Sequence, residues 1–170
     1  ENLYRSINIA LANEMKLICS KLKINVHNFI ETASTKNFGF QKFVPGPGLG
    51  GHCIPIDPYY LSWISEKKGY GPLLLKSAAK INNNMPKIIT NKILKYFKKK
   101  PKILIFGISY KKNVDDDRES PSFEFMKIFK KRGIKFDYFD PYFLKVKKGR
   151  KISIEKKSIK LNLKNIKNYD

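Results

Sequence analysis

Cysteine is scarce in this 170-residue chain, which contains only Cys19 and Cys53. Two cysteines cannot build the disulfide framework of a small secreted domain, so the sequence favours a reducing, cytoplasmic compartment. Two cysteines and two histidines also show no metal-ligand spacing, and we expect no bound metal. Cys19 lies within an apolar helical pattern and is expected to be buried.

Long apolar segments are absent as well. No run approaches the roughly 20 apolar residues that a membrane-spanning helix needs, so we expect no membrane partner. The chain does not begin with methionine, has no signal-like segment, and starts in the middle of a helical pattern. We therefore expect an interior fragment of a longer protein.

Acidic residues and arginine are also few. The chain has 14 Asp and Glu against 35 Lys and Arg, a formal charge of +21, and its only arginines are Arg5, Arg118, Arg132 and Arg150. A basic balance suggests nucleic-acid binding, but arginine is the preferred residue for bidentate phosphate and base contacts. The lysines are spread along the chain, with denser runs at residues 98–100 and 145–151. We expect no specific nucleic-acid binding, although an anionic ligand would be attracted.

The first hundred residues carry mainly helical patterns. Apolar residues at three- and four-residue intervals over residues 3–22 form one face of a long amphipathic helix. A short helix follows with Asn25 as its N-cap. Asp57-Pro58 begins a third helix, and two more are expected over residues 72–83 and 86–99.

After Pro101 the pattern becomes that of an α/β fold. Residues 103–107 form a continuous apolar run typical of a buried parallel strand. Ser120-Pro121 suits the start of a helix that ends at Gly133, and a second strand follows over residues 134–139. Strand, helix and strand make a βαβ unit, which exposes too much sheet to be complete.

The chain is therefore expected to be α/β overall, with two domains. Residues 1–100 would form a helical domain. Residues 101–170 would form part of a Rossmann-like domain.

A glycine-rich loop leads to the second cysteine. Its sequence is Gly46-Pro-Gly-Leu-Gly-Gly-His-Cys-Ile-Pro-Ile-Asp-Pro58. A free cysteine is most often a small buried apolar residue, but Cys53 also lies just before a helix start, where a thiol can be activated as a nucleophile. The neighbouring His52 is a candidate base, although adjacent side chains often point apart and a structural or surface role is favoured.

The same loop matches the dinucleotide-binding pattern at Gly46, Gly48 and Gly51, but we reject that interpretation. The pattern needs a strand before it and a helix directly after it. Here a short segment ending in proline precedes the loop, and Cys-Ile-Pro-Ile follows it. The strand of the βαβ unit ends in the single Gly107, so no intact dinucleotide fingerprint is visible.

A second motif follows the first strand of the βαβ unit. It runs Gly107-Ile-Ser-Tyr-Lys-Lys-Asn-Val-Asp-Asp-Asp-Arg-Glu-Ser-Pro121. Ligands dock outside the carboxyl ends of parallel strands, where a lysine suits a phosphate. A solvated charged loop is the alternative interpretation, and the pattern alone does not decide between the two.

Together the two motifs resemble the UDP-glucose/GDP-mannose dehydrogenase family. Glu1-Asn2, Thr35-Lys-Asn-Phe-Gly-Phe40 and Asp140-Pro141 agree with it in order and spacing, so the resemblance covers nearly the whole chain. Within the family, these motifs most resemble those of bacterial UDP-N-acetylglucosamine 6-dehydrogenases of surface-polysaccharide synthesis. The resemblance implies an NAD-binding Rossmann domain, a central helical domain that forms the homodimer, and a UDP-binding Rossmann-like domain.

The resemblance further implies oxidation of the sugar C6 alcohol to a carboxylate with two NAD. Cys53 would form a thiohemiacetal and then a thioester, Asp57 would position or activate water, and Asn2 would stabilise the oxyanion at C6. Tyr110 and Lys111 would contact the UDP. The residues implied for wrapping the nucleotide sugar are Val44, Pro45, Gly46, Pro47, Gly48, Leu49 and Gly50. Cys53 and Arg118 would contact NAD.

Parts of the family pattern are missing from these 170 residues. The family's catalytic lysine lies a few residues before the position of Asn2, and the NAD fingerprint and the latter half of the UDP-binding domain are also absent. We expect the 170-residue piece alone to be inactive. The alternative is a dimerising or nucleotide-sugar-binding module without chemistry.

Overall fold

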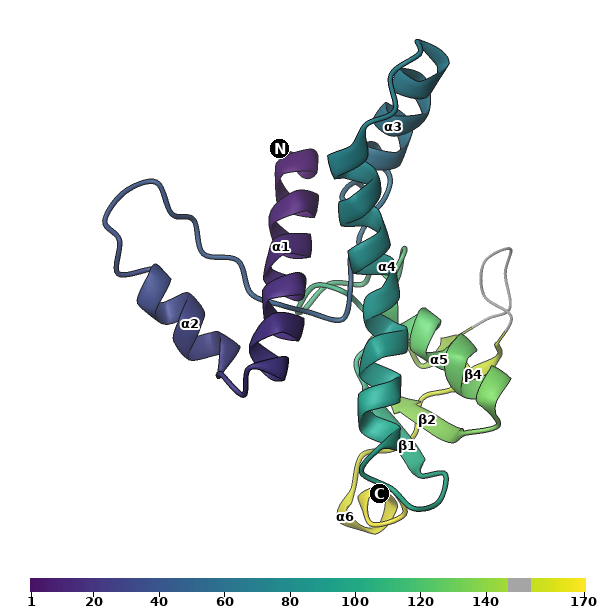
Figure 1. Cartoon of the computed structure of the whole chain (residues 1–170). Helices are drawn as coiled ribbons and strands as arrows, with labels where there is room; N and C mark the ends of the chain where they lie inside the picture. The colour runs from purple at the N-terminus through teal and green to yellow at the C-terminus, as the bar shows by residue number, and fades with distance from the viewer. Residues whose placement is uncertain (147–153) are drawn as a thin grey trace. The chain divides into compact units, whose positions relative to one another are not determined.

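The computed structural model describes residues 1–146 and 154–170 (Figure 1). The chain divides into two compact units, Glu1–Met85 and Pro86–Asp170. The division falls inside a helix, and the domain boundary expected between residues 100 and 101 stays a prediction.

The first unit is helical, as predicted. Its helices are α1 (Asn2–Lys21), α2 (Val26–Ala33), α3 (Asp57–Lys67) and the beginning of α4 (Leu73–Leu94). Helix α1 contacts both α2 and α3. The Asn25 side chain accepts a hydrogen bond from the His27 amide at 2.9 Å, so the predicted N-cap of α2 is confirmed. Cys19 is buried with Val26 and Ile30, also as predicted.

Between α2 and α3 the chain forms no helix or strand within the described residues. This segment, residues 34–56, carries the glycine-rich loop (Figure 1). Its course therefore depends on bonds to the helices around it.

Helix α4 corrects one prediction. Two helices separated near Pro86 were expected, but α4 is continuous from Leu73 to Leu94 with Pro86 inside it. A proline removes one backbone donor and usually breaks a helix. Here Met85, Pro86 and Thr90 are buried, and the Thr90 hydroxyl donates to the Pro86 carbonyl at 2.8 Å. Burial on both sides of the proline thus outweighs the local preference.

The second unit contains the predicted βαβ arrangement. Strands β1 (Lys102–Phe106) and β2 (Lys135–Phe139) are parallel, and α5 (Pro121–Arg132) connects them. The Ser120 side chain accepts from the Ser122 amide at the start of α5, and Gly133 ends the helix with a φ of 64°. The α/β fold expected from the sequence is therefore confirmed, although β1 is half-buried rather than fully buried.

One face of this sheet packs against α5. The core residues are Ile108, Phe123, Met126, Phe129, Ile134, Phe136, Tyr138, Val146 and Ile154. Three elements among the described residues of the basic C-terminal part were not predicted. They are the antiparallel strands β3 (Lys145–Val146) and β4 (Lys156–Lys157) and the short helix α6 (Leu163–Ile166). Strands of two residues are too short to show an alternating pattern. Most of the lysine run 145–151 lies outside the described residues.

Candidate functional site

Cys53 lies in the turn that leads into α3. Its carbonyl accepts hydrogen bonds from the Ile56 and Asp57 amides, both at 2.9 Å. The thiol is exposed, in contrast to that of Cys19. The Cys53 Sγ lies 3.9 Å from His52 Nδ1, so the two adjacent side chains do approach each other. An exposed thiol one turn before a helix is accessible to a ligand.

Asn2 and Asp57 lie together although 55 residues separate them. Asn2 is the first residue of α1 and Asp57 the first of α3. The Asn2 Nδ2 atom donates to Asp57 Oδ2 at 2.7 Å, and both residues are partly buried. An amide nitrogen carries two hydrogens, so Asn2 can orient the carboxylate and offer a second donor.

The glycine-rich loop is held against α1. The Gly46 amide donates to Asn13 Oδ1 at 2.8 Å. Farther along, Gly48 and Gly51 have φ values of 129° and 87°, which only glycine adopts readily. Gly48, Gly50 and Gly51 are buried, whereas Val44 is exposed.

In the second unit, the loop after β1 is fixed at both ends. The Gly107 amide donates to the Phe139 carbonyl at 2.9 Å, and the Ile108 amide donates to the buried Asp140 Oδ2 at 2.7 Å. The Ser120 hydroxyl donates to the Ile108 carbonyl. These bonds place residues 109–119 beside the carboxyl ends of β1 and β2, the edge where open α/β sheets bind ligands.

Within this loop Tyr110 is half-buried and Lys111 is exposed. Arg118 forms a two-point ion pair with Asp116, with Nε–Oδ1 at 2.8 Å and Nη2–Oδ2 at 2.9 Å. Burial and the neighbouring carboxylates raise the pKa of Asp117 above its usual value, although its own backbone hydrogen bond and Arg118 oppose the shift. Because Arg118 is paired with Asp116, a ligand that recruits the Arg118 guanidinium must compete with the Asp116 carboxylate.

The site residues predicted from the sequence fall into two groups. The first unit brings together Asn2 and Asp57, with Cys53 bonded through its carbonyl to the Asp57 amide. The second unit carries Tyr110 and Lys111.

Three buried polar residues support the candidate site and were not predicted to do so: Asn13, Asn82 and Asp140. Asn13 accepts from the glycine-rich loop and donates to Asn82, and Asp140 fixes the start of the loop after β1. The sequence offered one signal for these residues: Asn13 and Asn82 are polar residues within apolar helical patterns, and Asp140 directly follows a strand.

Within residues 1–146 and 154–170, none of the helices has the length and apolar content needed to span a membrane. In the same ranges, His, Cys, Asp and Glu side chains do not gather in threes that could hold a metal ion.

Family models match both parts of the chain. Residues 1–84 match the central domain of the UDP-glucose/GDP-mannose dehydrogenase family, and residues 104–170 match its UDP binding domain. Among curated relatives, the UDP-N-acetyl-D-mannosamine dehydrogenase of Methanococcus maripaludis is 43% identical over 146 residues, covering 84% of this chain and 33% of the relative. The UDP-N-acetyl-D-glucosamine 6-dehydrogenase of Salmonella typhi is 35% identical over 148 residues, covering 84% of this chain and 34% of that relative.

A solved structure agrees with these relatives. The UDP-D-ManNAc dehydrogenase of Pyrococcus horikoshii superposes with a TM-score of 0.75 at 35% identity, covering 84% of this chain and 34% of that one. The chain thus spans about a third of the length of the relatives it matches. On two family models and these relatives, the chain belongs to the UDP-glucose/GDP-mannose dehydrogenase family.

Proposed function

We propose that this chain is the cysteine-bearing and UDP-binding part of an NAD-dependent nucleotide-sugar 6-dehydrogenase. The observation that carries the proposal is the exposed Cys53 thiol one turn before α3. The Cys53 carbonyl accepts from the amide of Asp57, and the Asp57 carboxylate accepts from Asn2. Membership of a dehydrogenase family supports the assignment. The product would be a uronate used in surface-polysaccharide synthesis.

The reaction is a four-electron oxidation of the sugar C6 alcohol. The first oxidation removes a hydride and a proton and leaves an aldehyde at C6. The Cys53 thiolate then adds to that aldehyde, and the oxygen takes up a proton to give a thiohemiacetal. The second oxidation removes another hydride together with the hydroxyl proton and leaves a thioester. Water hydrolyses the thioester to the carboxylate and the free thiolate, with release of two protons.

The neighbouring residues would act on atoms around C6. Asn2 would donate to the oxygen that becomes negative when sulfur adds, and preorganised donors of this kind lower the barrier. Asp57, fixed by its bond to Asn2, would orient the water that attacks the thioester. The exposed position of Cys53 would admit the sugar.

The remaining predicted residues would bind the nucleotide sugar. The loop over residues 44–50 would wrap the ligand, with its buried glycines allowing close backbone approach. Tyr110 and Lys111 would contact the UDP, with the lysine near the pyrophosphate. The charge of +21 would attract this anionic ligand.

NAD would accept one hydride in each oxidation. The described residues do not form a nucleotide-binding strand, glycine turn and helix around Gly46, since no strand precedes that loop. Of this chain, only Cys53 and Arg118 are proposed to contact the cofactor. We therefore expect the 170-residue chain by itself to reduce no NAD.

The sugar is proposed to be an N-acetylhexosamine. UDP-GlcNAc is the substrate expected from the sequence, and one relative is named for N-acetyl-D-glucosamine. Another, more similar relative is named for N-acetyl-D-mannosamine. Both UDP-sugars, with UDP-glucose, belong in the assay.

Two further properties complete the proposal. The helical unit would form a homodimer, since α3 exposes the large apolar side chains of Tyr60, Leu61 and Trp63. The enzyme would work in the cytoplasm. Its exposed free thiol suits a reducing compartment.

The coding DNA upstream of Glu1 and the protein it encodes test the function. The upstream sequence should contain a strand, a GxGxxG turn and a helix, and then a lysine shortly before Glu1. The encoded enzyme should form two NADH per uronate from a UDP-sugar. A stop codon directly upstream, or no NADH with any of the three sugars, would refute the dehydrogenase and favour a binding module without chemistry.

A further inference from the structure

Two buried asparagines connect the glycine-rich loop to helices α1 and α4. Asn13 is 0% exposed and Asn82 is 1% exposed. Asn13 Oδ1 accepts from the Gly46 amide at 2.8 Å, and Asn13 Nδ2 donates to Asn82 Oδ1 at 3.0 Å. Asn82 Nδ2 in turn donates to the Ser6 carbonyl at 3.1 Å. All four residues belong to the first unit.

The two ends of this network fix the orientation of both amides. The Gly46 amide is a donor and requires an oxygen, whereas the Ser6 carbonyl is an acceptor and requires a nitrogen. An amide side chain that turned over would place nitrogen against donor or oxygen against acceptor. Asn82 therefore holds Asn13 in the orientation that presents its oxygen to Gly46.

The network is more than packing between helices. Two apolar residues could fill the same space without the desolvation of two amides. The amide of the half-buried Gly46, however, would then lose the acceptor it has now, and a backbone donor without an acceptor is costly. Because residues 34–56 form no helix or strand, this bond is a direct tie between the loop and α1.

We propose that Asn13 is a positioning residue for the nucleotide-sugar loop, with Asn82 orienting its amide. Gly46 lies two residues before Gly48, whose φ of 129° already restricts the course of the loop. Fixing the Gly46 amide sets where the following turn begins, so the loop is preorganised before the ligand arrives. The ligand assigned to the loop rests on the proposed function, whereas the positioning of the loop does not.

The first test measures amide hydrogen exchange by NMR on the 170-residue chain. Asn13→Leu removes the acceptor, whereas Asn13→Asp keeps an oxygen for Gly46 and loses the donor to Asn82. Ile30→Ala, in the separate cluster with Cys19 and Val26, is the control for general destabilisation. We expect Asn13→Leu to speed Gly46 exchange by at least about tenfold relative to Ile30→Ala at matched global stability. The Gly46 exchange rate of Asn13→Asp should stay closer to that of the unmodified chain.

The second test uses the encoded enzyme with the same substitutions. A looser loop should raise the KM for the UDP-sugar by about tenfold and leave kcat within about threefold, because the loop binds substrate and does not touch the reacting atoms. Asn13→Asp should have a KM close to that of the unmodified enzyme.

Three results would overturn the proposal, each in a different way. Unchanged Gly46 exchange in Asn13→Leu, or an equal change in Ile30→Ala, would show that the bond does not hold the loop. Faster Gly46 exchange with an unchanged KM would show that the position of the loop does not affect binding of the UDP-sugar. An unmodified enzyme with no activity on any UDP-sugar would refute the proposed function, while the exchange data would still decide the positioning role.

Discussion

Asp137 lies among two lysines and a tyrosine in the second unit. Its carboxylate accepts from Lys156 Nζ at 2.6 Å and from the Tyr169 hydroxyl at 2.9 Å, and Lys102 Nζ lies 3.7 Å away. Burial alone would raise the pKa of Asp137, but the hydrogen bonds from Lys156 and Tyr169 and the two lysine charges lower it below its usual value. Burial and the bond to Asp137 raise the pKa of Tyr169 to about 12.

Asp137→Asn should lower the free energy of unfolding by roughly 1–2 kcal/mol at pH 7. A carboxyl whose pKa is lower in the folded state stabilises the fold above its unfolded pKa, and that stabilisation disappears as the pH falls through the folded pKa. The difference between variant and unmodified chain should therefore shrink as the pH falls below about 4, the usual pKa range of an aspartate. Urea denaturation across this range measures it, and a difference independent of pH would contradict the account.

Single residues differ in how far the sequence reveals them. Asn2, Asp57 and Cys53 could be named from local motifs and a family resemblance. Asn13 and Asn82 could not, because their partners lie 33 and 69 residues away and depend on how the helices pack. A buried asparagine in a helical pattern does not itself indicate its partner.

Among the elements, helix ends were the most predictable. Asn25, Ser120 and Gly133 mark ends through local chemistry, and the structure confirms all three. The continuous helix α4 was not predictable, since it depends on burial around Pro86 that no local pattern records. Strands β3 and β4 are too short to leave a pattern.

The glycine-rich loop permits a matched comparison of two glycines. Gly48 has a φ of 129°, where a side chain is strained, whereas Gly46 has an ordinary φ and nothing within 4 Å of an added Cβ. Gly48→Ala should lower the free energy of unfolding by about 1–3 kcal/mol, and Gly46→Ala should change it by less than about 0.5 kcal/mol. Thermal and urea unfolding measure both, and equal effects would show that backbone conformation does not limit this loop.

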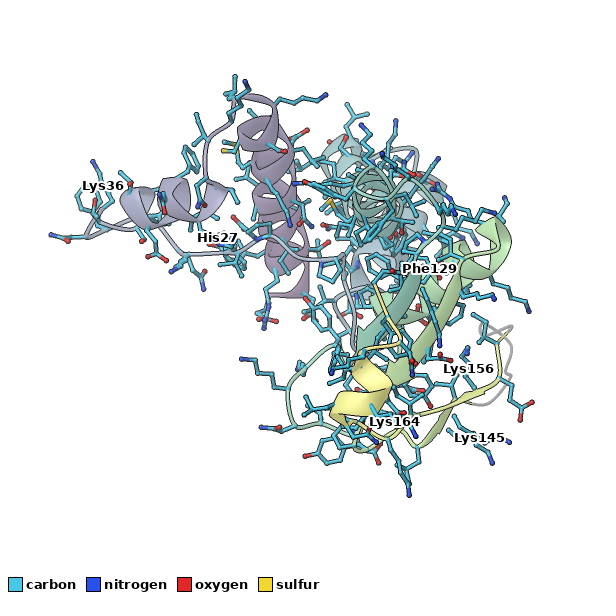
Figure 2. All side chains as sticks on the ribbon, turned by 90° about the horizontal axis from the view of Figure 1, so that it is seen from below. His27, Lys36, Phe129, Lys145, Lys156 and Lys164 are labelled. Carbon is cyan, nitrogen blue, oxygen red and sulfur yellow. The ribbon has the colours of Figure 1, made fainter. Side chains whose placement is uncertain are left out.

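At the scale of the whole molecule, the positive charge is spread along the sequence and over both units. Lys36 in the first unit and Lys145 and Lys164 in the second, all labelled in Figure 2, are exposed. No single basic face is needed to explain the charge of +21.

A salt titration separates the two possible anionic partners. If the chain binds a nucleotide sugar, it should prefer UDP over ADP and GDP, with a shallow dependence on salt. A nucleic-acid binder would instead lose affinity steeply, by roughly 1000-fold or more between 50 and 200 mM salt if it contacts several phosphates. Calorimetry with UDP and fluorescence anisotropy with a DNA duplex provide the comparison. A steep slope with no preference for UDP would contradict our account.

The two units each have a core of their own and match different domains of one enzyme family. The central claim is that the first of them carries the nucleophile. That role belongs to the complete enzyme, because this chain spans about a third of its relatives.

Uronate formation by the Cys53→Ser enzyme, measured by mass spectrometry of the sugar product, tests this claim most directly. Cys19→Ala is the control, because Cys19 is buried in the core of the first unit. Our account predicts that Cys53→Ser forms no uronate, because the variant has no thiolate at position 53 to add to the C6 aldehyde. Cys19→Ala should continue to form uronate. Undiminished uronate from Cys53→Ser would contradict the covalent role of Cys53.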